Sequence, residues 1–339
     1  ILFGGDASAH SLNYSREELH DLISYVVNEI SSVFPNVPFL FALGNNEFIP
    51  NYGSNDFSTD TKDFASISTI LSRFMNEDQL QTFQKGGYYY HDFVESKLRL
   101  LIVNSIIYNG GRDDQVDPYD QFQWIYKSAI EAHKQGLRVG ICTHISPGLS
   151  FVSYVSPNQV WKERYLREFN TLINEVEIDF ILSGHIHYDM LISTNETSKQ
   201  YSLSAPAVSP QHTNNPSFRV FKYSEGRLLN YIQYYADIGN NPTNELEWKI
   251  EYTFQDAYRQ TKIGHENVEE AVHWITNTSE GRWSYIEKLG SFALEDGKLY
   301  YCLLKSSTLV QLLQCTQNHK ITMESISKLN TFFPYNGEK

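Results

Sequence analysis

Four short segments, far apart in the sequence, each carry side chains that can bind metal ions. Each segment follows an apolar run, and they begin at Gly5, Gly44, Thr143 and Gly184. Together they supply one aspartate, one asparagine and three histidines: Asp6, Asn45, His144, His185 and His187. This mixture of oxygen and nitrogen ligands suits a pair of divalent cations. Two cations about 3.5–4 Å apart can promote the hydrolysis of phosphate esters, which is the chemistry that the segments predict.

The residue types indicate which role each candidate residue would have at such a metal centre. A carboxylate oxygen can bridge two cations, so Asp6 is the expected shared ligand, whereas Asn45 offers a neutral carbonyl oxygen. His10 lies four residues after Asp6 and is a candidate donor of the proton that a leaving alcohol needs. Each segment alone is weak evidence, because Gly-Asp and His-x-His are common, so the prediction depends on their order.

Strands and helices must bring these segments together. Up to about Ser183, strand-like apolar runs alternate with helical patterns, which predicts an α/β fold. A capping box at Ser15 predicts the start of one helix, and apolar spacing predicts another over residues 64–83. All four segments follow predicted strands. In α/β sheets ligands bind at the carboxyl ends of strands, so we expect the segments to converge there.

The character of the chain changes after Met190. Several consecutive strands predict a second sheet, and from about Asn244 the pattern becomes mostly helical, with residues 251–260 as one candidate helix. A break near residue 240 separates the predicted domains. We therefore expect a phosphoesterase-type domain over residues 1–240 and a mostly helical C-terminal region over residues 241–339.

The composition narrows the possible partners. The net charge of −13 disfavours binding to a nucleic-acid polymer, and no apolar run approaches the roughly 18 residues that a membrane helix needs. Of the three cysteines, Cys142 reads as a buried strand thiol. Cys302 and Cys315 could pair in an oxidising compartment, which the sequence alone leaves open.

The ordered segments resemble those of the calcineurin-like metallophosphoesterases and, more narrowly, those of the acid sphingomyelinase-like phosphodiesterases. The resemblance runs from residue 1 to about residue 260. The narrower match rests on these pieces: Gly5-Asp6 with His10, Gly86-Gly87-Tyr88-Tyr89, Gln121-Phe122-Gln123-Trp124, His144-Ile145-Ser146-Pro147-Gly148, Ala205-Pro206-Ala207-Val208-Ser209-Pro210, Asn214-Asn215-Pro216 with Phe218-Arg219, and Trp248-Lys249.

The resemblance implies a four-layer α/β/β/α sandwich with two divalent metal ions, expected to be zinc. Carried over, Asp6 bridges the metals, a group of three residues completes one site, and His187 belongs to the other. That group consists of Asn45, His144 and His185. His10 becomes a candidate proton donor. The family also implies a disulfide between Cys302 and Cys315, and a secreted, lysosomal or vacuolar location.

The sequence departs from the family pattern in two places. The family's first block, Asp-x-His, and its strand would lie upstream of Ile1, so we expect these two ligands, and any saposin-like segment, to lie outside this sequence. Asn46 stands where most members have a histidine that contacts the scissile phosphate. Asn46 is therefore a candidate catalytic residue that can donate a hydrogen bond but cannot carry a proton.

Three functions remain open at this stage. The first is a metal-dependent phosphoric diester hydrolase acting on a small phosphodiester or lipid head group, such as a nucleotide or sphingomyelin. The second is an endopolyphosphatase or nucleotide pyrophosphohydrolase, which Gly44-Asn45-Asn46 also fits. The third is a phosphate-ester-binding pseudoenzyme, motivated by Asn46. His187 favours the sphingomyelinase-like reading.

Overall fold

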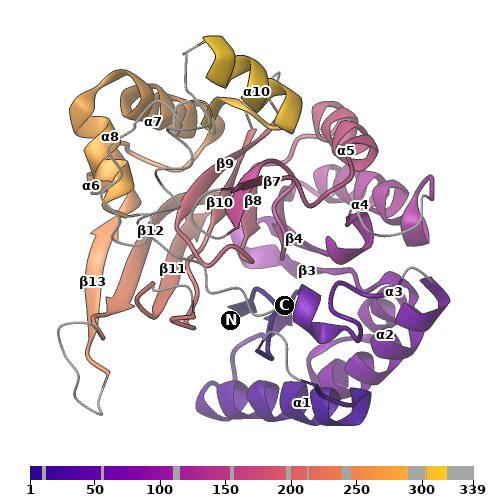
Figure 1. Ribbon diagram of the computed structural model, residues 1–339. Helices are drawn as coiled ribbons and strands as arrows, with labels where there is room; N and C mark the ends of the chain where they lie inside the picture. Colours follow the sequence, from indigo (N-terminus) through magenta and orange to yellow (C-terminus); the bar gives the residue numbers. More distant parts are fainter. Residues whose placement is uncertain are drawn as a thin grey trace. The chain divides into compact units, whose positions relative to one another are not determined.

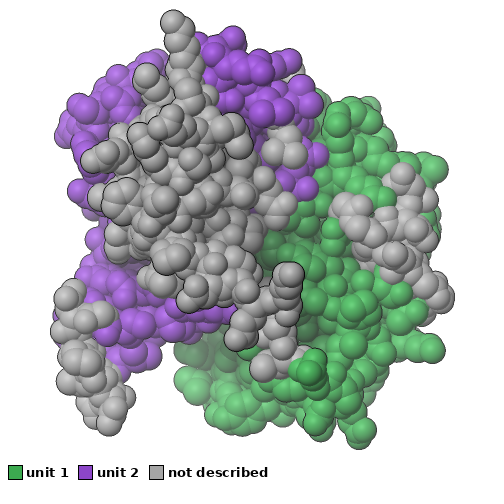
Figure 2. Space-filling model, viewed as in Figure 1, with its two compact units in different colours: residues 1–145, 160–185 green, residues 146–159, 186–339 purple. Residues whose placement is uncertain are grey.

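A computed structural model describes most of the chain: residues 1–9, 13–54, 57–109, 115–152, 156–195, 200–211, 214–238, 246–288, 302 and 304–318. The chain forms two compact units (Figure 2). The first contains residues 1–145 and 160–185, and the second contains residues 146–159 and 186–339. The predicted domain boundary near residue 240 falls in 239–245, outside the described residues, and stays a prediction.

The first unit is built on parallel strands, which confirms the predicted α/β class. Its main strands lie in the order β3-β4-β5-β8, and β4, β5 and β8 are parallel to one another. Their bounds are Tyr89–Phe93, Leu98–Val103, Arg138–Thr143 and Phe180–Ser183. Every residue of β4 is buried, as expected for a strand covered on both faces. A second parallel pair joins β1 (Leu2–Phe3) to β2 (Leu40–Phe41).

Helices of the first unit pack on these strands and on one another (Figure 1). They are α1 (Arg16–Val33), α2 (Phe57–Leu71), α3 (Glu77–Gly86), α4 (Gln121–Lys134) and α5 (Glu163–Glu175). Helix α1 begins with the predicted capping box at Ser15. Residues 64–83 are helical as predicted except at Met75 and Asn76, where α2 and the short 3₁₀ turn after it end before α3 begins. Asn76 caps a separate helix, since it accepts a hydrogen bond from the Gln79 N–H while Gln79 caps the Asn76 N–H, both at 2.9 Å.

The second unit contains the consecutive strands predicted after Met190. Strands β9 (Met190–Asn195) and β10 (Gln200–Ser204) form an antiparallel pair. A separate antiparallel sheet consists of β11 (Ser217–Ser224), β12 (Arg227–Ala236) and β13 (Trp248–Thr253). A short hairpin joins β6 (Ser150–Val152) to β7 (Ser156–Asn158).

Helices follow β13 in the described part of the chain: α6 (Phe254–Tyr258), α7 (His265–Asn277), α8 (Ser279–Ile286) and α10 (Leu309–Asn318). The helix predicted over residues 251–260 is wrong at its first three residues, which belong to β13. Tyr252 lies in β13 opposite Gln233, and the buried Tyr252 side chain packs on this sheet, so the helix begins only after Thr253.

The cysteines behave as the sequence and the resemblance predict. Cys302 and Cys315 form a disulfide with their Cα atoms 5.5 Å apart, and Cys142 is a buried free thiol. Within the described residues, none of the helices combines the length and the apolar character needed to cross a membrane.

Candidate metal centre

Four of the five predicted ligands meet in the first unit. The Nε2 atom of His144 lies 3.2 Å from Asp6 Oδ2, 3.1 Å from Asn45 Oδ1 and 3.1 Å from His185 Nδ1. The candidate ligand atoms of Asp6, His144 and His185 all lie within 4.8 Å of one another. Atoms bound about 2.0–2.2 Å from one metal ion lie roughly 3.0–3.5 Å from each other, so the spacing fits shared coordination.

The hydrogen bonds of these residues show that lone pairs face the centre. His144 Nδ1 lies 2.6 Å from the carbonyl oxygen of Gly4, so Nδ1 carries the proton and Nε2 is left as an acceptor. Asn45 Nδ2 donates two hydrogen bonds elsewhere, which turns its Oδ1 toward His144. Asp6 Oδ2 is buried and receives no hydrogen bond from the described residues. Converging acceptors repel one another unless a positive charge lies among them, and a divalent cation fits this donor set.

The pKa values of His144 and Asp6 are shifted by their close contact. Burial alone would lower the pKa of His144, but the charge of Asp6 and the hydrogen bond to the Gly4 carbonyl raise it. Burial alone would raise the pKa of Asp6, but the charge of His144 and the hydrogen bond from the Asn46 backbone N–H lower it to about 2. Asp6 is therefore anionic, and positive charge is favoured beside it.

Each candidate ligand lies one to four positions after the end of a strand of the first unit. Asp6 follows β1, Asn45 follows β2, His144 follows β5 and His185 follows β8. Strands β5 and β8 are parallel, and the N–H of Gly184 donates to the His144 carbonyl at 2.9 Å. The carboxyl ends of these strands thus meet at one edge, where α/β sheets bind ligands.

The backbone at the ligands is unusual. Asp6 and His185 have positive φ values of 61° and 71°, a left-handed conformation that costs energy for residues other than glycine. Gly5 lies directly against Gly44, and a Cβ at Gly5 would come within 2.6 Å of the Gly44 nitrogen and 2.8 Å of His144 Nδ1. Glycine at position 5 therefore lets the two loops touch and brings Asp6 to His144.

Asn46 is almost buried, at 5% exposure, and its atoms bind neighbouring loops. Its Nδ2 donates to the Ser8 carbonyl at 3.0 Å, and its Oδ1 accepts from Asn45 Nδ2 at 2.9 Å and also from Asn51 Nδ2. Its backbone N–H donates to Asp6 Oδ1 at 2.9 Å. These contacts hold Asp6 and Asn45 in place.

Glu47 and Tyr52 also support the centre, although the sequence analysis assigned them no role. The fully buried Glu47 carboxylate accepts backbone N–H groups from Asp6 at 2.9 Å, Ala7 at 2.6 Å and Gly44 at 2.6 Å. Burial and the charge of Asp6 raise the pKa of Glu47 to about 7, against these hydrogen bonds. Tyr52 places its hydroxyl 3.4 Å from His185 Nε2, so His185 Nδ1 faces the centre.

Two predicted residues are not among these four. His187 belongs to the second unit, where it is nearly buried, has a φ of 63° and accepts a hydrogen bond at its carbonyl from the Ala207 N–H at 3.4 Å. His10 falls in residues 10–12, outside the described residues, so its role as proton donor stays a prediction.

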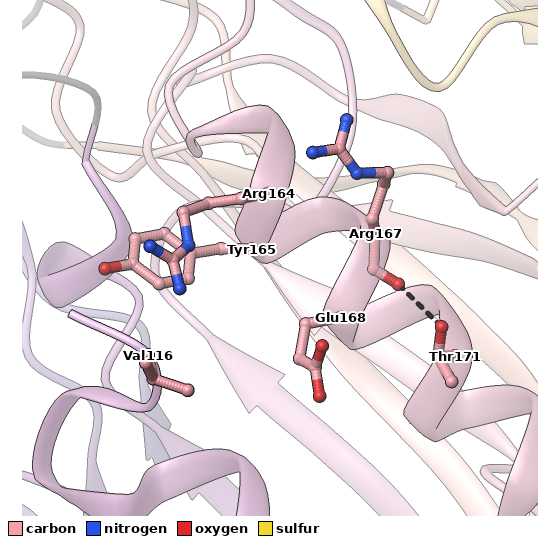
Figure 3. Close-up of a pocket in the computed structure, with 6 residues that line it drawn as sticks. All are labelled: Val116, Arg164, Tyr165, Arg167, Glu168 and Thr171. Carbon is pink, nitrogen blue, oxygen red and sulfur yellow. Dashed lines mark hydrogen bonds between the residues drawn. The ribbon is translucent and has the colours of Figure 1, made fainter. Parts of the chain in front are cut away.

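A pocket on α5 contains none of the predicted site residues (Figure 3). Its lining is Val116, Arg164, Tyr165, Arg167, Glu168 and Thr171. All of these residues except Val116 come from consecutive turns of one helix, and three of them, Arg167, Glu168 and Thr171, are exposed. The converging donors of Asp6, Asn45, His144 and His185 therefore mark the stronger candidate site.

Comparison with known proteins gives matches over both units. Cyclic GMP-AMP phosphodiesterase SMPDL3A from Bos taurus is 27% identical over 278 residues, which cover 76% of this chain and 61% of the relative. Sphingomyelinase phosphodiesterase D from Dictyostelium discoideum is 24% identical over 335 residues, which cover 93% of this chain and 74% of the relative. A dimetal phosphatase structure from Danio rerio is 13% identical, with a TM-score of 0.41, and the match covers 68% of this chain and 79% of that one.

Two family models match separate parts of the chain. Residues 200–278 match the acid sphingomyelin phosphodiesterase C-terminal region. Residues 1–189, more than half of the chain, match the calcineurin-like phosphoesterase model and include every ligand of the cluster. The chain therefore belongs to the calcineurin-like phosphoesterases.

Proposed function

We propose that this chain is the core of a metal-dependent phosphoric diester hydrolase of the acid sphingomyelinase-like kind. The observation that carries the proposal is the meeting of four lone-pair donors, from four strand ends, around His144 Nε2. The match to the acid sphingomyelin phosphodiesterase C-terminal region supports the narrower assignment. Relatives named as phosphodiesterases support the reaction class.

The donor set favours two divalent ions, and we propose zinc, because imidazole nitrogen and carboxylate oxygen are common zinc ligands. Asp6 would bridge the ions, with Asn45, His144 and His185 completing one site and His187 serving the other. Bound divalent cations polarise a phosphoryl oxygen and lower the pKa of water.

The residues of the chain contribute orientation and charge. The Asn46 N–H holds Asp6 Oδ1 and leaves Oδ2 directed to the centre. Gly4 and Tyr52 fix which ring nitrogens of His144 and His185 face inward. Asn45 is neutral, which limits the negative charge that an anionic phosphodiester meets. His10 is the proposed donor of a proton to the leaving oxygen.

We propose a small phosphodiester or a lipid head group as substrate, of the nucleotide or sphingomyelin type. The relatives are named for both substrate classes. The net charge of −13 disfavours a polymeric nucleic acid.

One observation favours a non-catalytic alternative: Asn46 cannot carry a proton, and its carboxamide binds neighbouring residues.

The direct test uses protein expressed from the full reading frame, with Asp6→Ala as the variant and the exposed Asp21→Ala as the matched control. Loss of this ligand should lower the rate of hydrolysis of a nitrophenyl phosphodiester by more than about 100-fold. The metal content of the variant should fall as well. Asp21→Ala should behave as wild type. Full metal content and activity in Asp6→Ala would reject the proposed centre.

A substrate panel separates the alternatives. Wild-type protein that hydrolyses a nucleotide diester or sphingomyelin supports the main proposal. Preference for polyphosphate or a nucleotide pyrophosphate supports the endopolyphosphatase or pyrophosphohydrolase reading. Protein that binds metal and phosphodiester without turnover supports the pseudoenzyme.

We also propose a secreted, lysosomal or vacuolar location. The disulfide between Cys302 and Cys315 supports it, because such bonds persist in oxidising compartments. Peptide mapping of natively purified, non-reduced protein should recover the two cysteines linked. Two free thiols would contradict the proposal.

A further inference from the structure

A buried ion pair lies beside His187 in the second unit. Arg219 on β11 pairs through Nη2 with Oδ1 of Asp189, and the two side chains are only 2% and 4% exposed. Asp189 is two residues after His187, and its Oδ2 accepts the hydroxyl proton of Tyr252 on β13. The carboxylate that follows the histidine is therefore bound by two strands of the β11-β12-β13 sheet (Figure 1).

The remaining nitrogens of Arg219 are also bound. Nε donates to Gln233 Oε1 at 2.7 Å, and Nη1 donates to the Ser204 carbonyl at 3.1 Å. The guanidinium carbon lies 4.1 Å from the centre of the Tyr231 ring. Because a planar guanidinium has fixed donor directions, these contacts leave it a single orientation.

The Ser204 segment connects Arg219 to the backbone of His187. The Ser204 hydroxyl donates to the Tyr188 carbonyl at 3.1 Å, and the Ala207 N–H donates to the His187 carbonyl at 3.4 Å. His187 itself has a left-handed φ of 63°, which its surroundings must hold. Arg219 is thus linked to the two residues that follow His187, to Asp189 directly and to Tyr188 through Ser204.

Stability alone does not account for such a pair. Burying two charges removes their hydration, and replacing a buried pair by apolar residues is often neutral or stabilising. A buried pair is better suited to selecting one geometry, as it does where it fixes the register of packed elements. Here the geometry selected is that of the residues around His187.

We propose that Arg219 is a positioning residue for His187. By binding Asp189 and the carbonyl of Ser204, Arg219 orients the His187 imidazole for metal binding. The proposal rests on the proposed function in one respect, that His187 is a metal ligand. It gives a role to Phe218-Arg219, which the sequence analysis singled out only for its resemblance.

The chain contains a matched control in its first unit. Arg99 is 1% exposed and pairs with Asp92 through two contacts of 2.7 Å. Its Nη1 donates to the Ser128 carbonyl at 3.1 Å, and its guanidinium carbon lies 3.8 Å from the Tyr90 ring centre. Arg99 therefore has the same kinds of partner as Arg219, but Asp92 is not next to a candidate ligand.

The experiment measures metal release from the protein expressed from its full reading frame, at graded chelator concentrations, by elemental analysis. Arg219→Lys keeps the charge but loses the fork of donors. We expect one of the two metals to be bound about 10–100-fold more weakly, as for other residues that orient ligands. Arg99→Lys should lower Tm to a similar extent and release metal as wild type does. Tyr252→Phe removes only one hydroxyl from Asp189 and should weaken the same metal with the fold intact.

The outcomes separate the two proposals. Wild-type release curves for both Arg219→Lys and Tyr252→Phe, whatever their Tm, would overturn the positioning role of Arg219. If Arg219→Lys does not fold, Tyr252→Phe alone decides in the same way. Wild-type protein that binds no metal would instead reject the proposed function, and that result is visible before any variant is compared.

Discussion

At the scale of single residues, a ligand serves a metal only if an atom with a lone pair faces it. Three neighbours settle this in the first unit. Gly4 accepts the proton of His144 Nδ1, Tyr52 lies against His185 Nε2, and Asn46 accepts from the amide of Asn45. Each candidate ligand is thus held with a lone pair toward the proposed metal site.

Asn46 should therefore act on metal binding more than on proton transfer. Asn46→Ala removes the acceptor for Asn45 Nδ2 and the donor to Ser8, so Asn45 is no longer oriented. We expect metal affinity to fall about 10–100-fold. Competitive chelator titration measures it, with the exposed Asn28→Ala as control. Unchanged affinity with lower turnover would show that Asn46 contacts substrate instead.

The leaving-group proton is a separate matter, assigned to His10. His10→Ala should slow hydrolysis of an alkyl phosphodiester by about 10²–10⁴-fold, the usual contribution of a general acid. Hydrolysis of a nitrophenyl diester should be nearly spared, because its leaving group, nitrophenolate, is a stable anion that needs no proton. Asn46 cannot supply the proton for either ester. Rates on the two esters, at matched metal content, test this. Equal losses would make His10 a positioning residue.

The ligand types could be predicted from sequence because each lies in a short segment of recognisable pattern. The supporting residues could not. Glu47 binds the N–H groups of Asp6 and Ala7, some 40 residues away, and this contact exists only once β1 and β2 are paired. Its position three residues after Gly44, whose N–H it also caps, was the local signal available.

At the scale of elements, the strand ends that carry ligands were predictable from apolar runs, but helix boundaries were less so. The sequence predicts that residues 64–83 are helical but does not locate the boundary inside them. The break arises because Asn76 and Gln79 cap each other's backbone N–H groups, which makes a new helix start more favourable than continuation. The error over residues 251–260 has a tertiary origin, since Tyr252 is buried against β12.

The cap at Asn76 should be measurable. Asn76→Ala removes the oxygen that accepts the Gln79 N–H at 2.9 Å, so the first turn of α3 loses a partner. We expect the free energy of unfolding to fall by about 1 kcal/mol. Urea denaturation measures the change, with Gln81→Ala, at an exposed position in the same helix, as control. A loss no greater than that of the control would show that α3 is held by packing alone.

At the scale of the whole molecule, the candidate centre joins segments that are far apart in the chain. Within the first unit, Asp6 lies 138 positions before His144 and 179 positions before His185. Bringing such distant segments together costs loop-closure entropy, and a bound ion that requires all four ligands stabilises only the folded arrangement. Metal binding and folding of this unit are therefore expected to be linked.

Removal of metal should then lower thermal stability reversibly. At a free metal concentration of about 100 times Kd, one bound ion adds about 2.7 kcal/mol to the free energy of unfolding. A chelator should abolish that gain, so Tm falls, and added zinc should restore it. Differential scanning calorimetry of metal-loaded, chelated and reloaded protein makes the measurement. In Asp6→Ala the bridging ligand is absent, so the chelator should shift Tm much less than in wild type. An equal shift in both proteins would place the stabilising ion elsewhere, and the Asp6 centre would lose its support.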